Sequence, residues 1–393
     1  MDGSRLQDIK DWLIDGARSA ATPSEMMAEC CERLIGLGIP LWRVGVFVRT
    51  LHPEIYGRSF IWRQGAEVET GTVDYSFQDS PTFRDSPLAA VVEQGVSFRA
   101  NPQAPEAEPY PILMDLRAEG VTDYVALPMT FLERQMHASS WTTKVPGGFT
   151  DAQVEAIRAL IPALSRYTEI VSLQRTAAML LDTYVGNRAG ERILGGQIRR
   201  GHTDSMHAAI WLSDLRGFTP LSDRLPSETV VDILNQYFDC QVTAIREQGG
   251  EVLKFMGDGL LAVFPIAERD GDPAEVCGRV LQAARQSRGS VDALAYQTGD
   301  TVERFRFGVA LHVGKLLYGN IGGGNRLDFT CIGPAVNLAA RLEKLTSRLK
   351  RTIVASEAFA GLSGEDWTEL GAFPIAGLST EQRVFGLRDE AAA

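Results

Sequence analysis

The sequence predicts two α+β domains joined by a helical linker. The chain has 393 residues, which is long enough for two or three domains. Helical and strand-like patterns are mixed in both halves, as is typical of the α+β class. Between the halves, apolar residues recur at threes and fours over residues 150–184, which predicts one long helix. We therefore expect an N-terminal domain at 1–165, a helical linker and joint at 166–202, and a C-terminal domain at 203–393.

The composition excludes several classes of protein. The net charge of −11 argues against a nucleic-acid partner, although a few local cations and metal ions suffice for a nucleotide site. The five cysteines and five histidines show no metal-ligand spacing, and scattered cysteines suit a reducing compartment. No apolar run approaches the length of a membrane span, and the first residues lack the profile of a signal peptide. We therefore expect a cytoplasmic protein.

The N-terminal domain is expected to combine helices with a small sheet. Residues 5–38 are predicted to be helical, with Ser24 as a capping residue, and residues 41–51 alternate as a strand. The elements expected next are a strand at 59–63, a helix at 87–94, a proline-rich loop at 101–111, and strands at 121–131 and 137–143. This layout resembles the GAF family of small-molecule sensor domains, which end in a helix that carries a signal to an effector.

Four aromatic residues of this domain have two interpretations. They could line a pocket for an unidentified small-molecule ligand, or they could pack in an ordinary core. The domain could also be a dimerisation module that binds no ligand. The four residues are Trp42, Trp62, Trp141 and Tyr124.

The long helix is expected to begin at a capping box formed by Thr150 and Gln153. A helix of this length extends beyond the face of one domain, which predicts a helical seam between two parallel chains. The alternative is that it packs on the sheet of its own domain, and both can hold for different segments. Several glycines follow at residues 186–201, which we expect to be a flexible joint.

The C-terminal domain is expected to contain a strand, a helix, a hairpin, a second helix and further strands. The predicted strands lie at 206–212, 305–313, 327–332, 352–355 and 382–387, and the predicted helices at 226–248, 272–287 and 334–345. The turn of the hairpin is Gly257-Asp258-Gly259. This order of elements is the ferredoxin-like, palm-type arrangement, in which the first strand lies beside the hairpin.

Asp214 and Asp258 form a candidate metal site in that arrangement. Asp214 follows the first strand and Asp258 lies at the tip of the hairpin, so the fold would bring the two side chains together. Each aspartate alone is consistent with an ordinary turn or capping residue. Two carboxylates at the ends of neighbouring strands, however, are what a site for two Mg²⁺ or Mn²⁺ ions requires.

Four motifs in order give the C-terminal domain a family resemblance. They are Ser213-Asp214-Leu215-Arg216-Gly217-Phe218-Thr219, Lys254-Phe255-Met256-Gly257-Asp258, Leu311-His312-Val313-Gly314, and the segment from Phe329 to Glu343. Together they resemble the class III nucleotidyl cyclases over roughly residues 203–388. Thr330 is typical of a subgroup that has threonine where many relatives have aspartate.

The resemblance implies an adenylate cyclase, which converts ATP to 3′,5′-cyclic AMP and pyrophosphate. Asp214 and Asp258 would bridge two metal ions in each active site. Asn337 would position the ribose, and Arg341 would stabilise the charge that develops on the α-phosphate. The backbone N–H groups of Phe218 and Thr219 are expected to contact the phosphates. Glu343 is expected to be ordinary charge on the helix surface.

Lys254 and Thr330 are the positions that select the purine in this family. Lysine is a donor suited to N1 of adenine, and the Thr330 hydroxyl can accept a hydrogen bond from the exocyclic amine. The pair therefore favours ATP. Two alternatives stay open, namely a guanylate cyclase and a catalytically silent nucleotide-binding signalling module.

One position departs from the family pattern. Many cyclases have a basic residue for the terminal phosphates near the final strands, where this chain has Ala376. Arg383 and Arg348 are candidate substitutes.

The resemblance also implies a homodimer. One subunit would supply Asp214 and Asp258, and the other would supply the residues for the base, ribose and α-phosphate. A head-to-tail dimer would then contain two equivalent sites. The N-terminal domain would control catalysis through the long helix.

Overall fold

The computed structural model describes residues 3–132, 135–267, 271–298, 301–324, 326–364 and 367–390. The chain forms two compact units, Met1–Leu180 and Leu181–Ala393. Each unit combines helices with a sheet, which confirms the predicted α+β class. Within the described ranges, every helix is too short or too polar to span a bilayer.

The N-terminal unit is built on one antiparallel sheet of six strands in the order β3-β2-β1-β6-β5-β4. The strands are β1 Arg43–Arg49, β2 Ile55–Arg63, β3 Glu69–Asp74, β4 Phe98–Ala100, β5 Asp123–Thr130 and β6 Met136–Thr143. Side chains alternate across β1, so Val44 packs in the core on one face while Arg43 and Phe47 line a cavity on the other.

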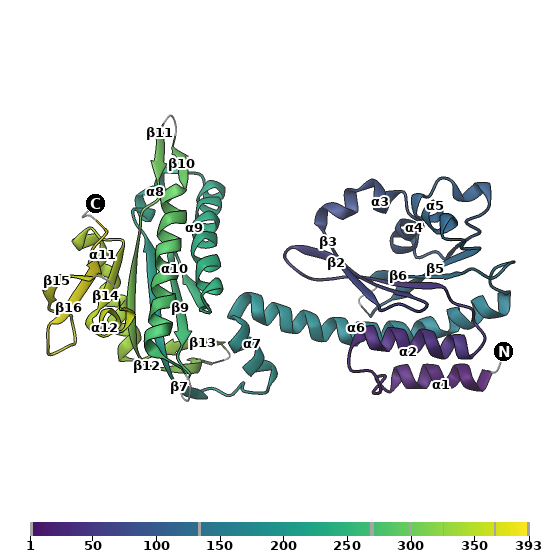
Figure 1. The fold of residues 1–393 in the computed structure, drawn as a ribbon, viewed down its shortest axis with the longest axis horizontal. Coiled ribbons are helices and arrows are strands. Elements are labelled where there is room, and N and C mark those ends of the chain that lie inside the picture. Colours follow the sequence, from purple (N-terminus) through teal and green to yellow (C-terminus); the bar gives the residue numbers. More distant parts are fainter. Residues whose placement is uncertain are drawn as a thin grey trace. The chain divides into compact units, whose positions relative to one another are not determined.

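Helices cover both faces of this sheet (Figure 1). One face carries α1 Gly3–Ile14, α2 Pro23–Gly36 and α6 Asp151–Val185, and the other carries α3 Pro81–Arg84, α4 Pro87–Gln94 and α5 Pro111–Ala118. Leu13, Leu34 and Leu160 join the three helices of the first face into one core. Val91 and Leu113 join α4 and α5 into a second core.

Three local features of this unit differ from the sequence analysis or were not foreseen by it. The helix expected at 5–38 is two helices, and Thr22 rather than Ser24 caps the second, because the Thr22 hydroxyl accepts the Glu25 N–H at 3.2 Å. The loop expected at 101–111 ends at α5, which has Pro111 in its first turn, where proline costs no hydrogen bond. β3 was missed because five of its six residues are Glu, Gly, Thr or Asp.

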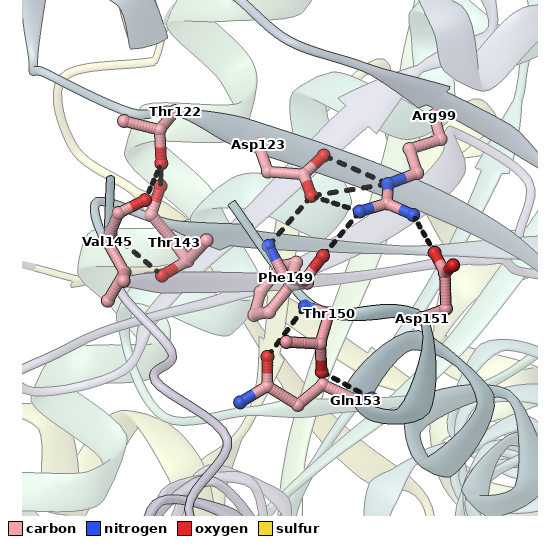
Figure 2. A network of polar contacts seen from close by, with 9 residues as sticks. All are labelled: Arg99, Thr122, Asp123, Thr143, Val145, Phe149, Thr150, Asp151 and Gln153. Atoms are coloured by element: carbon pink, nitrogen blue, oxygen red, sulfur yellow. Dashed lines mark hydrogen bonds and ion pairs between the residues drawn. The ribbon is translucent and has the colours of Figure 1, made fainter. Parts of the chain in front are cut away.

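The predicted capping box begins α6 (Figure 2). The Gln153 side chain accepts the Thr150 N–H at 2.9 Å, and the Thr150 hydroxyl accepts the Gln153 N–H at 3.3 Å. Beside it, the Arg99 guanidinium lies 2.8 Å from Asp123 and donates to the Phe149 carbonyl at 2.6 Å. These bonds attach the start of α6 to β4 and β5.

The 35 residues of α6 fall into two parts. Residues from Val154 to Leu164 pack in the core of the N-terminal unit. Further along the helix, more than half of the Ile170 and Leu173 side chains is exposed. The first part therefore packs on its own sheet, and the second part carries an exposed apolar face.

The expected joint at 186–201 contains a packed helix, α7 Asn187–Leu194. Ala189 is fully buried in the C-terminal unit, and the Arg188 backbone N–H donates to Glu251 at 3.0 Å. Residues 187–194 are thus attached to the C-terminal unit, because the small residues Ala189 and Gly190 allow close packing.

The C-terminal unit contains a sheet in the order β15-β16-β14-β12-β7-β9-β8, and β13 pairs with β12. The strands are β7 Thr203–Leu215, β8 Glu251–Met256, β9 Gly259–Pro265, β12 Phe307–Gly323, β13 Arg326–Ile332, β14 Ile353–Ser356, β15 Trp367–Phe373 and β16 Gln382–Leu387. The segment β12-β7-β9-β8 has the strand order of the predicted ferredoxin-like arrangement. As predicted, the first strand β7 lies beside the hairpin strand β9.

Both faces of this sheet are buried. α9 Ser227–Glu247, α10 Pro273–Ala293 and α12 Glu357–Ser363 share one core with Trp211 of β7, and Figure 1 shows α9 and α10 side by side. Ile210, the preceding residue, points into a core that includes Ala189 of α7 and Ala339 of α11 Pro334–Leu349. Between β7 and α9 lies the short helix α8 Phe218–Arg224.

β12 is longer than the predicted strand, which ended near residue 313. Despite its several glycines, it runs to Gly323. A Cβ on Gly319 would lie 2.1 Å from the His202 carbonyl oxygen, so this glycine permits a close backbone approach. The segment between the predicted helix at 272–287 and the predicted strand at 305–313 contains two further strands, β10 Ala295–Thr298 and β11 Thr301–Arg304, which pair with each other.

Candidate functional site

The hairpin places Asp258 directly beside Asp214. β8 and β9 are joined by the two-residue turn Gly257-Asp258, in which Gly257 has a positive φ of +69°. Asp214 on β7 is paired in register with Gly259, the first residue of β9. A Cβ on Gly259 would lie 3.4 Å from the Asp214 Oδ1 atom and 3.1 Å from the Ser213 carbonyl. Glycine is therefore required for this close approach.

The two carboxyl groups repel each other. Burial and then the negative charges of Asp258 and Glu343 raise the pKa of Asp214 to about 7. Like charges in contact disfavour joint ionisation, whereas a divalent cation would favour it. Carboxylate oxygens are hard donors of the kind that Mg²⁺ and Mn²⁺ prefer. Asp214 and Asp258 thus fit the role of metal ligands by their donor chemistry.

Glu343 is the functional-site neighbour that the sequence analysis misjudged. It was expected to be ordinary surface charge, but it is half-buried, and burial raises its pKa. The Thr346 hydroxyl donates to it at 3.5 Å. Within the described residues no set of three or more His, Cys, Asp or Glu side chains is arranged to hold a metal. The negative charge of Glu343 contributes to the raised pKa of Asp214.

A buried polar layer lies beneath Asp214. The Ser213 hydroxyl donates to the Gln241 side-chain oxygen at 2.5 Å. The Tyr237 hydroxyl and the Gln241 Nε2 atom are buried without a hydrogen-bond partner in the part of the chain that the structure describes. Both residues belong to α9, which therefore supports the end of β7 from below.

The two purine-selecting candidates lie on β8 and β13, which are not paired with each other in the sheet but are linked by an ion pair. The Lys254 ammonium on β8 is 2.8 Å from the Asp328 carboxylate on β13. Thr330 follows two residues later on β13 and is only 6% exposed. Its Oγ1 atom has no hydrogen-bond partner among the described residues. Sequence reasoning missed Asp328, although its spacing of two from Thr330 in a strand was a usable signal.

Asn337 and Arg341 lie one turn apart on α11. Asn337 is exposed and Arg341 is half-buried. The Arg341 guanidinium reaches the loop that contains Ala376, because a Cβ on Gly377 would lie 3.3 Å from its Nη2 atom. The structure therefore brings Arg341 to the position where the terminal-phosphate cation was expected.

The two candidate substitutes for that cation are engaged elsewhere. Arg383 forms ion pairs with Glu357 and with Glu369, the latter at 2.6 Å. The Arg348 guanidinium lies 5.8 Å from the centre of the Phe373 ring.

Phe218 and Thr219 are the first two residues of α8, after Gly217 in the left-handed conformation. The first N–H groups of a helix have no acceptor within the helix, which is consistent with the predicted backbone contacts.

His312, from the third sequence motif, lies outside these groups. It is buried on β12, and its Nδ1 atom is 2.8 Å from the Ser356 hydroxyl. Burial lowers the pKa of His312 to about 4, so it is neutral at pH 7.

The site residues form separate groups within one chain. Asp214 and Asp258 make the acidic pair, whereas Lys254 lies on β8 and Thr330 on β13. Across the described residues, no hydrogen bond or ion pair joins the acidic pair to Lys254, Thr330 or α11. In one copy of the chain these groups are therefore not directly connected.

A palm-type α+β domain with paired carboxylates beside a buried strand is the class that this geometry defines. Residues 202–387 match the family described as adenylate and guanylate cyclase catalytic domain. The matched segment contains all four motifs, so the resemblance of the C-terminal unit to cyclase catalytic domains is confirmed.

Two relatives illustrate the match. An adenylate cyclase of Anabaena cylindrica is 32% identical over 162 residues, which are 41% of this chain and 32% of that protein. A terminal-differentiation specific adenylate cyclase of Dictyostelium discoideum is 30% identical over 153 residues, 38% of this chain and 7% of that protein. The chain thus spans a third or less of the length of these relatives.

Among solved structures, the adenylyl cyclase CyaB from P. aeruginosa is similar to this chain with a TM-score of 0.42 and 23% identity. The alignment covers 48% of this chain and 97% of that one.

If Asp214 and Asp258 bind metal, a divalent cation should stabilise the folded chain, and Asp258→Asn should abolish this stabilisation. Saturating Mn²⁺ is expected to raise the melting temperature of the wild-type chain by roughly 5 °C, as tight binding to the folded state requires. Asp258→Asn should lose most of this rise. In the presence of a chelator, the melting temperature of Asp258→Asn should be no lower than that of the wild type, because the substitution removes the charge repulsion with Asp214. Differential scanning calorimetry measures both.

Asp232→Asn is the matched control, since Asp232 is exposed on α9. If Mn²⁺ stabilised Asp258→Asn as much as wild type, the acidic pair would not be the metal site.

Proposed function

We propose that this protein is an adenylate cyclase, which converts ATP to 3′,5′-cyclic AMP and pyrophosphate at a site shared by two copies of the chain. The observation that carries the proposal is the contact between Asp214 and Asp258 at the C-terminal end of β7. It occurs within a domain whose family consists of cyclase catalytic domains.

The reaction joins the ribose 3′-oxygen to the α-phosphorus. The bond from the α-phosphorus to the bridging oxygen breaks, pyrophosphate leaves, and the 3′-hydroxyl loses its proton. Such a transfer depends on positioning and on neutralising charge. Asp214 and Asp258 would hold two Mg²⁺ or Mn²⁺ ions, which when bound lower the pKa of the 3′-hydroxyl and neutralise the phosphates.

The chain's own side chains would orient the nucleotide. Asn337 would hydrogen-bond the ribose, and Arg341 would donate to the α-phosphate from a planar group that keeps its charge. Arg341 also lies beside Gly377, so its charge extends toward the phosphates that the missing basic residue at Ala376 would otherwise contact. Phe218 and Thr219 would add backbone N–H groups.

The purine pocket supports ATP as the substrate. Lys254 would donate to N1 of adenine. The Thr330 hydroxyl, buried without a partner, would accept from the exocyclic amine. A buried polar atom without a partner costs about 1–3 kcal/mol, which a bound adenine would recover.

One observation favours the second candidate, a guanylate cyclase. The Asp328 carboxylate lies beside Lys254, and a carboxylate can accept from the N1–H and N2–H groups of guanine. The ion pair with Lys254 argues against binding of guanine by Asp328, because the carboxylate already interacts with the ammonium group. A silent nucleotide-binding module is the third candidate, and the presence of both aspartates with Asn337 and Arg341 argues against it.

A head-to-tail homodimer would complete the half-sites. Large apolar side chains are exposed on the same elements that carry the site, with Phe255 on β8 at 53% and Ile332 on β13 at 44%. Exposed apolar residues around incomplete sites favour a protein interface there. The acidic pair of one copy would then face Lys254, Thr330 and Arg341 of the other.

Mixed dimers test the shared site. Asp258→Ala and Arg341→Ala are each expected to lower kcat/KM at least a hundredfold, because each removes charge stabilisation from both sites. An equimolar mixture should recover about a quarter of wild-type activity. Half of its dimers are mixed, and each mixed dimer has one intact site of two.

Asp258→Ala mixed with Asp214→Ala is the control, since both changes fall in the same half-site and no recovery is expected. Recovery in this control, or its absence in the first mixture despite exchange of subunits, would contradict a shared site.

Base selection is tested with ATP and GTP in Mn²⁺, with the products separated by chromatography. The wild-type kcat/KM for ATP should exceed that for GTP at least tenfold. Thr330→Val should lower kcat/KM for ATP by roughly tenfold or more, because it removes the acceptor without changing shape. Thr368→Val, on the exposed surface of β15, is the matched control. An equal or higher kcat/KM for GTP would establish the guanylate cyclase instead.

We also propose that the N-terminal unit regulates catalysis through α6. The exposed apolar face at Ile170 and Leu173 fits a helical seam between two chains. The GAF-like sensor role of this unit is part of the same proposal, and its layout of a helix-covered antiparallel sheet supports it.

Removal of residues 1–180 tests the regulation. The shortened chain keeps α7, whose Ala189 is buried in the C-terminal unit. Its specific activity should depend more steeply on protein concentration, because the helical seam no longer supports dimerisation. Activity assays from nanomolar to micromolar protein measure this. An unchanged activity and concentration dependence would exclude control by the N-terminal unit.

A further inference from the structure

A cavity of about 230 Å³ lies in the N-terminal unit. Its lining residues come from β1, β2, β5 and β6 of the sheet and from α3, α4 and α5. Phe47, Phe83 and Tyr124 contribute aromatic walls. Of the four aromatic residues singled out in the sequence, only Tyr124 lines it, whereas Trp62 and Trp141 pack in the core on the opposite face.

The charged residues that line this cavity are all positive. Arg43, Arg49 and Arg58 line it, and none of its lining residues is Asp or Glu. Arg43 is only 6% exposed, and its guanidinium makes no ion pair or hydrogen bond within the described residues. Burial lowers the pKa of Arg43. A buried cation without a partner is costly, so an anion in the cavity would be stabilising.

Unsatisfied hydrogen-bonding groups point to the same conclusion. The Ser86 hydroxyl, the Ser140 hydroxyl and the His137 Nε2 atom are buried, lack partners among the described residues, and belong to residues that line the cavity. His137 and Ser140 are each 1% exposed. Three orphaned groups around one space are unusual, because nearly all buried polar groups in folded proteins are paired.

His137 faces the cavity as a donor. Its Nδ1 atom accepts the Arg49 backbone N–H at 3.0 Å. Burial and then the charge of Arg49 lower the pKa of His137 to about 4, so the ring is neutral at pH 7. With Nδ1 as the acceptor, the proton of the neutral ring is on Nε2. This N–H therefore seeks an acceptor.

A glycine keeps the polar end of the cavity open. Gly45 is paired in register with Ser140, and a Cβ there would lie 2.8 Å from both the Ser140 Oγ atom and the Phe47 ring. Any larger residue would displace the groups that form the cavity wall.

We propose that this cavity binds a small aromatic carboxylate. The carboxylate would pair with Arg43 and accept from His137 and Ser140, and the ring system would pack against Phe47 and Tyr124. The volume is below the roughly 300 to 1,000 Å³ of sites for drug-sized ligands, which suits one or two rings. The proposal concerns the N-terminal unit alone, so it stands or falls independently of the cyclase activity.

Calorimetric titration of the full chain with 2-naphthoate and its neutral analogue 2-naphthamide tests the charge requirement. 2-Naphthoate should bind with a Kd below about 1 mM, and 2-naphthamide at least tenfold more weakly, because it cannot neutralise Arg43. Absence of saturable binding by 2-naphthoate, or equal affinity of the two probes, would overturn the proposal. Both arms use the wild-type protein, so they do not depend on the folding of a variant.

Two variants locate the site. Arg43→Met and Ser140→Ala should each weaken 2-naphthoate at least tenfold, because each removes an interaction with the charged carboxylate. Arg63→Met is the matched control, because Arg63 pairs with Arg43 across the β1–β2 ladder but binds Glu69 and does not line the cavity. Circular dichroism verifies each fold, and if Arg43→Met is unfolded, Ser140→Ala decides. Wild-type affinity in the folded variants would overturn the proposal.

Discussion

The pairing of β7 with β9 is the constraint on which the C-terminal site depends. Its register sets Asp214 opposite Gly259 and so beside Asp258. A slip of one residue would turn Asp214 to the opposite face of the sheet. The absence of a side chain at Gly259 lets the carboxylate approach, while α9 supports the strand through Gln241. The result is a contact between like charges, which favours the binding of a cation.

The two functional residues of the β8–β9 hairpin contact different parts of the sheet. Asp258 at its tip contacts β7, whereas Lys254 on its outer strand contacts Asp328 of β13. Because the contacts of one chain leave these groups unconnected, the proposed chemistry requires a second copy. Control of catalysis then becomes control of how two copies associate, which is a role that the exposed second part of α6 is suited to perform.

Each unit contains uncompensated charge, which is negative in the C-terminal unit and positive in the N-terminal unit. The C-terminal unit holds two carboxylates in contact, and the N-terminal unit holds a buried guanidinium with no ion pair within the described residues. Uncompensated charge in a partly buried site costs folding free energy. In both units this cost is explained if the site is completed by a ligand of opposite charge, a divalent cation in one and an organic anion in the other.

The sequence by itself determined the α+β class, the long helix with its capping box, and the adjacency of Asp214 and Asp258, because these follow from local periodicity, short motifs and one strand order.

Only the tertiary structure decided which charges are compensated. Lys254 meets Asp328 74 positions away, Arg383 is engaged by Glu357 and Glu369, and the charge of Glu343 acts on Asp214. The anion cavity was equally inaccessible from the sequence, because Arg43, His137 and Ser140 meet only through the pairing of β1 with β6 and the cover of α4. Such contacts depend on register and packing between distant segments, and no local pattern specifies them.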